Sequence, residues 1–154
     1  MLVIAGLLLG MGVSLQFVPR RPGVLLSYAA MLVGIAAGEM FFTAYTLIFW
    51  GVAALIAAAI GFMMPRVALF ERMLQVYVAV GSFAGAIAGF AAGTMAAVIG
   101  AAAAGAFAGA FAYSRSPRGR GDTGFSLIAA TAACGLPAVV NFSITALSVA
   151  RLIY

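Results

Sequence analysis

The sequence has very little of what enzymes use for chemistry. It contains no histidine, one cysteine (Cys134) and three acidic residues (Glu39, Glu71 and Asp122) among 154 residues. A metal site, a hydrolytic triad or a pair of catalytic carboxylates needs several such groups close together. A single cysteine cannot form an intramolecular disulfide. We therefore predict that the chain is not an enzyme and binds no metal or cofactor.

Charge is also scarce, and this scarcity places the chain in a membrane. Only 7% of the residues are charged and 66% are hydrophobic, and the mean hydropathy is +1.22. A soluble protein carries roughly a quarter charged residues, so this chain could not cover its surface against water. The lipid bilayer is its expected partner. The sequence predicts an all-α integral membrane protein with a single transmembrane domain over residues 1–154.

Charges, prolines and glycines divide the chain into six apolar segments. A helix needs about 20 apolar residues to cross roughly 30 Å of hydrocarbon. The segments predict helices at about 2–18, 24–37, 42–63, 76–92, 95–113 and 125–152. Pro19 and Pro22 end the first of these, and a turn near Gly38 separates the second from the third. We expect a compact bundle of five or six transmembrane helices, packed through glycine and alanine.

Two of the segments leave alternatives open. The helix at 24–37 is short for a full crossing: it either spans with little tilt, extends past Glu39 and carries that carboxylate into the membrane, or is re-entrant. Residues 66–75 predict an amphipathic turn of helix, because Arg66, Glu71 and Arg72 alternate with apolar side chains.

The arginines predict which side of the membrane each loop faces. With six crossings, alternate loops share a side, and seven of the eight arginines then fall together: Arg20, Arg21, Arg66, Arg72, Arg115, Arg118 and Arg120. Glu39 and Arg151 fall on the other side. Basic loops stay in the cytoplasm, so we expect cytosolic basic loops and both termini outside. The arginines are scattered and form no basic face, so we expect no nucleic-acid partner.

Small residues recur at every fourth position in the fourth and fifth predicted helices. The repeat is Gly81, Gly85, Gly89 and Gly93, answered by Ala97, Ala101, Gly105 and Gly109. Residues four apart share a helix face, and a face of small residues lets helices approach closely in lipid. The tight turn at Gly93 and Thr94 favours pairing of these two helices. Alternatively, one stripe packs between copies of a homo-oligomer, or glycine carbonyls line a permeation path.

Three residues are candidates for a solute or ion site. Glu39 is the one acid that could lie at membrane depth, where an ionisable group is a functional candidate. Gly135 and Pro137 predict a break in the last helix with Asn141 one turn further on, an arrangement that can form a midplane transporter site. The alternative interpretations are structural: Glu39 caps an interfacial hairpin, and Asn141 bonds to a neighbouring helix beside a packing kink.

The order of these features is similar to that of a known family. The matching pieces are the turn with Pro19, Pro22 and Gly23; the run from 80 to 90 with Gly81, Gly85 and Gly89; and the Ala-Gly-Ala-Phe motif ending at Phe111. They resemble the DUF456 family of small bacterial membrane proteins. The chain departs from the family pattern at Asn141, where members often carry a basic residue, and at Ser114 and Arg115, where members carry an acid. The resemblance implies an uncharacterised protein of the bacterial inner membrane.

Two functions are compatible with these features. The first is a small, homo-oligomeric transporter or channel-like protein for a small solute or ion, acting through Glu39, Pro137 and Asn141. The second is a structural or accessory subunit that docks a partner membrane protein or lipid through a glycine-zipper face.

Overall fold

The computed structural model is all-helical, as the sequence predicts. It describes residues 2–18, 23–68, 72–120 and 127–153, without the side chains of residues 64–68, 72 and 118. The helices are α1 (Leu2–Gln16), α2 (Gly23–Ala36), α3 (Ala44–Ala68), α4 (Arg72–Ala91), α5 (Met95–Arg115), α6 (Pro117–Arg120), α7 (Leu127–Ala130), the π-helix η1 (Thr131–Gly135) and α8 (Leu136–Ile153). The last three form one continuous helix, so the described residues contain six main helices and the short α6.

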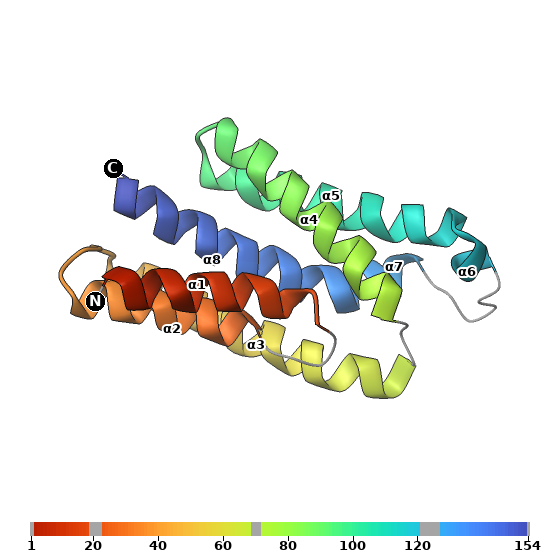
Figure 1. Cartoon of the computed structure of the whole chain (residues 1–154), viewed down its shortest axis with the longest axis horizontal. Helices are drawn as coiled ribbons and strands as arrows, with labels where there is room; N and C mark the ends of the chain where they lie inside the picture. Colours follow the sequence, from red (N-terminus) through yellow and green to blue (C-terminus); the bar gives the residue numbers. More distant parts are fainter. Residues whose placement is uncertain (1, 19–22, 69–71, 121–126, 154) are drawn as a thin grey trace.

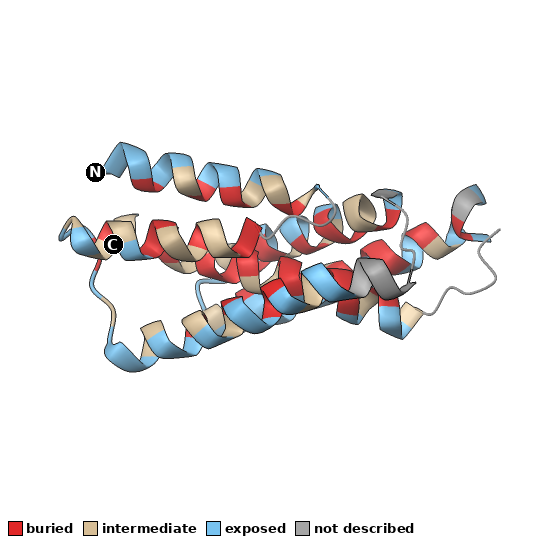
Figure 2. Ribbon diagram, turned by 90° about the horizontal axis from the view of Figure 1, so that it is seen from below, coloured by how far each residue is buried: buried red, intermediate tan, exposed pale blue. Residues whose placement is uncertain are grey.

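The continuous helix from Leu127 to Ile153 is the centre of the bundle. Its α8 part packs against α1, α2, α3, α4 and α5. Over half of its most apolar stretch (56%) is buried, compared with 22 to 33% for the three other long apolar helices. Figure 1 shows the two chain ends at one end of the bundle and α6 at the other. In Figure 2 the buried residues lie on the inward sides of the helices and the exposed ones on the outside.

Within the described residues, four helices are long and apolar enough to cross a membrane, and α1 and α2 are shorter. With 15 and 14 residues, they are about 22 and 21 Å long at 1.5 Å per residue, less than the roughly 30 Å of a hydrocarbon core. Because α2 ends at Ala36, it does not extend past Glu39. The chain is therefore compatible with a membrane bundle of four long helices and one short helical hairpin.

The helix boundaries differ from the predicted ones at several points. The helix α3 continues to Ala68 instead of ending at residue 63, because a proline such as Pro65 removes one hydrogen bond without having to end a helix. The predicted amphipathic turn at 66–75 is therefore divided between the end of α3 and the start of α4, and Glu71 lies outside the described residues. The first helix ends at Gln16, two residues earlier than predicted.

Alanine dominates the core around α8. One buried cluster joins α2, α3 and α8 and includes Trp50, Ala54 and Ile144. Another joins α4, α5 and α8 through alanines and Phe142. Small side chains let the axes of the helices lie close together, so the contacts depend on close backbone approach more than on bulky side chains.

Candidate functional site

Asn141 lies at the centre of a buried polar cluster. It is fully buried beside the midpoint of the continuous Leu127–Ile153 helix. Its Nδ2 donates hydrogen bonds to the carbonyl of Gly12 (3.0 Å) and to Oε1 of Gln16 (3.1 Å). Its Oδ1 accepts one from Oγ of Ser27 at 2.5 Å. Both hydrogens of the Asn141 amide are therefore donated, and the side chain links α8 to α1 and α2 by hydrogen bonds.

Gln75 extends this cluster to a fourth helix. Its Nε2 donates to the backbone carbonyl of Gln16 at 3.0 Å. Gln16 is the last residue of α1, where a helix leaves carbonyls without an intrahelical donor. We name Gln16, Ser27, Gln75 and Asn141 the amide cluster. A bilayer offers no water to such groups, so their mutual hydrogen bonds stabilise the junction of α1, α2, α4 and α8.

Gly12 and Gly23 let α1 and α2 approach closely enough for the hydrogen bonds of the amide cluster to form. A Cβ atom on Gly12 would collide with Oγ of Ser27 and lie 2.9 Å from the carbonyl oxygen of Gly23. A Cβ atom on Gly23 would collide with the carbonyl oxygen of Gly12 and lie 3.3 Å from Nδ2 of Asn141. Any side chain here would separate α1 from α2 and move the acceptors away from Asn141.

The predicted break in the last helix takes the form of a π-helical turn. The turn η1 occupies Thr131–Gly135 and ends two residues before Pro137, and the Leu136 N–H donates to the carbonyl of Ala132. Proline has no N–H for the carbonyl four residues earlier, and a wider turn accommodates that loss. Pro137 is buried. The helix changes its winding at this point but continues to Ile153.

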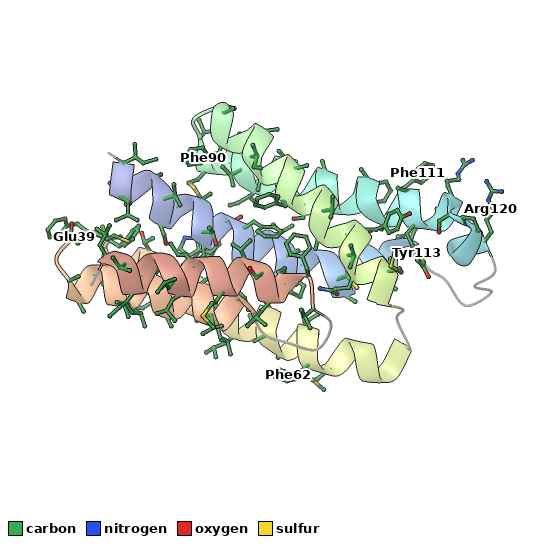
Figure 3. The ribbon with its side chains drawn as sticks, viewed as in Figure 1. Glu39, Phe62, Phe90, Phe111, Tyr113 and Arg120 are labelled. Carbon is green, nitrogen blue, oxygen red and sulfur yellow. The ribbon has the colours of Figure 1, made fainter. Side chains whose placement is uncertain are left out.

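Glu39 lies in the turn between α2 and α3, not inside the bundle. The Gly38 N–H donates to the carbonyl of Ile35, and the Glu39 N–H donates to the carbonyl of Gly34. With Gly38 at φ +72°, this pattern is the Schellman motif that ends helices. The Glu39 side chain is exposed, and Figure 3 shows it at the end of the bundle opposite Arg120. This position agrees with the interfacial interpretation of Glu39.

The small-residue stripes of α4 and α5 face each other within the chain. Cβ atoms built on Gly81, Gly85 and Gly89 would collide with the carbonyl oxygens of Gly105, Ala101 and Ala97. A Cβ atom on Gly109 would collide with the carbonyl of Tyr77 on α4. Gly93 is in the connecting turn at φ +80°, where a Cβ atom would meet no heavy atom within 4 Å. The two backbones are too close to leave a path between them.

The basic residues can be placed in part. Arg20 and Arg21 lie outside the described residues, as do the side chains of Arg66, Arg72 and Arg118. These three residues belong to the end of α3, the start of α4 and α6, and these parts of the helices lie towards the same end of the bundle as the end of α5 (Figure 1). Arg151 is near the other end, with its guanidinium carbon 5.7 Å from the ring centre of Phe42.

Four cavities are formed by the described residues, and their linings are mainly apolar. One of about 170 Å³ lies between α4 and α8, beside Phe83, Phe90 and Phe142. Others lie between α5 and η1, beside the α4–α5 turn, and along the outer side of α1. None of these four is lined by Asn141 or Glu39. Among the described residues, no three His, Cys, Asp or Glu side chains gather to hold a metal ion.

No family model matches the chain, and no curated protein or solved structure matches it. The resemblance to the DUF456 family therefore stays a prediction.

Proposed function

We propose that the protein is a non-enzymatic structural or accessory subunit of a membrane assembly, and that the outer side of α1 docks a partner transmembrane helix. The observation that carries this proposal is an open small-residue face. At Gly6 and Gly10, a Cβ atom would meet no heavy atom within 4 Å. Ser14 follows four residues later and is exposed. We name Gly6, Gly10 and Ser14 the open α1 face.

The open α1 face has the shape that helix docking in lipid requires. A shallow, open groove of about 370 Å³ lies along it, lined by residues of α1 alone, with Leu7 and Met11 among them. The Ser14 hydroxyl already donates to the carbonyl of Gly10 at 2.8 Å, so it needs no water when another helix covers it. Small residues four apart allow close backbone approach, which drives helix association in a bilayer. The same chemistry already holds α4 against α5 in this chain.

The state of the amide cluster also favours a structural role. A solute site needs polar groups that can exchange their partners for the solute. Both hydrogens of the Asn141 amide are instead donated to Gly12 and Gln16, and none of the cavities described above reaches it. The polar interior thus supports assembly of the bundle.

A matched pair of variants tests the docking surface. Gly10→Leu fills the groove, whereas Gly100→Leu adds the same side chain at a position of α5 that is equally open. We expect Gly10→Leu to reduce recovery of the partner, or of a second copy of the chain, at least tenfold in mild-detergent purification, and Gly100→Leu to leave it unchanged. Equal recovery for the wild type and both variants would contradict the proposal.

Transport of a small solute or ion is the second candidate. It is favoured by the π-helical turn beside Pro137 and by three buried hydroxyls, of Ser82, Ser143 and Ser148, that have no hydrogen-bond partner among the described residues. Transport predicts that the purified protein raises ion or solute flux in liposomes above the protein-free level. It also predicts that Asn141→Leu abolishes this flux while Gly10→Leu does not.

A further inference from the structure

The end of the bundle formed by α5 and α6 presents arginines that the proposed docking function does not use. Arg115 ends α5 and Arg120 ends α6, and both side chains are exposed. Among the described residues the one carboxylate side chain is Glu39, which lies at the opposite end (Figure 3). Neither guanidinium therefore has a described carboxylate to neutralise it.

The α5–α6 corner is held in one conformation by short-range hydrogen bonds. The Ser116 N–H and hydroxyl both donate to the carbonyl of Tyr113, at 3.0 and 2.6 Å. The Gly119 N–H donates to Oγ of Ser116 at 3.2 Å. A Cβ atom on Gly119 would collide with the carbonyl of Tyr113. Because residue 119 is glycine, α6 can pack closely against the end of α5. This packing fixes the backbone position of Arg120.

Arg115 is placed on the outer surface of the bundle. Its guanidinium carbon lies 5.0 Å from the ring centre of Phe111, and Phe111 is 44% exposed. Phe107, one turn earlier on the same face, is 47% exposed. These apolar rings face lipid if α5 spans the bilayer, so the guanidinium one turn beyond Phe111 lies at the depth of the headgroups. A cation–π contact of this kind holds the charge at that depth.

We propose that Arg115 and Arg120 form a binding site for the phosphate of an anionic phospholipid such as phosphatidylglycerol. Guanidinium groups bind phosphate oxygens through paired hydrogen bonds, and basic groups next to the end of a transmembrane helix attract anionic headgroups. The exposed rings of Phe107 and Phe111 lie below this phosphate and contact the acyl chains. The inference is independent of what docks on α1.

Lipid titration of the detergent-solubilised protein, followed by native mass spectrometry, tests this site. The probes are phosphatidylglycerol and phosphatidylcholine with identical chains. The wild type is expected to bind phosphatidylglycerol more tightly. A basic residue near an anionic surface contributes about fivefold in affinity, the equivalent of ~1 kcal/mol. The double variant Arg115→Gln/Arg120→Gln is thus expected to lose about 25-fold for phosphatidylglycerol and nothing for phosphatidylcholine.

The control variant is Arg151→Gln, which removes one exposed arginine near the other end of the bundle and should leave phosphatidylglycerol binding unchanged. Size-exclusion chromatography of each variant verifies that the bundle is intact. Equal wild-type affinity for both lipids, or undiminished phosphatidylglycerol affinity in the double variant, would overturn the site. Competition by inorganic phosphate at the concentrations at which the lipid binds would overturn its assignment to a lipid.

Discussion

At the scale of single residues, the amide cluster explains how polar side chains are accommodated in so apolar a chain. Asn141 is fully buried and bonded to Gly12, Gln16 and Ser27. In a hydrocarbon environment an unpaired amide costs several kcal/mol, and removing Asn141 takes away the partner of both Gln16 and Ser27. The cluster therefore holds together only when all of its helices are in place.

Asn141→Leu is expected to destabilise the bundle. Interhelical hydrogen bonds in membranes contribute about 0.6 kcal/mol on average, so losing three lowers the free energy of unfolding by about 2 kcal/mol. Thr145→Val is the control, because the Thr145 hydroxyl bonds only to the carbonyl of Asn141 in its own helix. We expect its effect to stay below about 0.5 kcal/mol. Unfolding in mixed detergent micelles measures both; a stability loss for Asn141→Leu no larger than the control's would contradict the structural role.

The sequence could identify Asn141 but not its partners. It is the one amide in the last apolar segment and follows Pro137, so its type and position stand out. Gln16 lies inside the predicted helix at 2–18 and Gln75 at the end of the predicted amphipathic turn at 66–75, so neither position stands out. No periodicity relates residues 16, 27, 75 and 141, because only the packing of four helices brings them together. Gly12 and Gly23 were missed for the same reason.

At the scale of helices, two helix pairs pack through close approach of their backbones. In α4 and α5 the approach involves Gly81 and Gly105, and in α1 and α2 it involves Gly12 and Gly23. The first pair was predictable, because the four-residue repeat is long and the connecting turn is short. The second was not, since Gly12 and Gly23 have no repeat around them. Helix number followed from hydropathy, whereas helix ends depended on local hydrogen bonds that hydropathy does not report.

Gly81→Ala is expected to separate α4 from α5. The added methyl group would overlap the Gly105 carbonyl, and overpacking of this kind costs about 1–3 kcal/mol. Gly100→Ala, in open space on α5, should leave the stability equal or up to about 1 kcal/mol higher, because alanine favours helix. Thermal unfolding in one detergent compares the two. If both variants melted like the wild type, the close packing of α4 and α5 would be refuted.

At the scale of the whole molecule, charge separates the two ends of the bundle. The described arginines of α5 and α6 lie at one end, and Glu39 and Arg151 lie near the other. From the positive-inside rule we predict an orientation in which the α5–α6 end faces the cytoplasm and both termini lie outside. This orientation would also place the proposed lipid site in the cytoplasmic leaflet.

Cysteine labelling tests the orientation. In a Cys134→Ala background, Glu39→Cys and Pro117→Cys each place one exposed thiol near opposite ends of the bundle. A maleimide that cannot cross membranes is expected to label Glu39→Cys in intact spheroplasts and Pro117→Cys only in inside-out vesicles. The reverse pattern would invert the orientation, and labelling of both positions from one side would show that the chain does not cross as the six-helix threading requires.

The central claim is that the protein acts by docking a helix on the open α1 face. A photo-crosslinking scan along α1 in native membranes tests it most directly. Docking on α1 predicts protein crosslinks from probes at Gly6, Gly10 and Ser14, and none from Ile99 or Gly100 on the open side of α5. Crosslinks at none of the α1 positions, or equal crosslinking from α1 and α5, would contradict it.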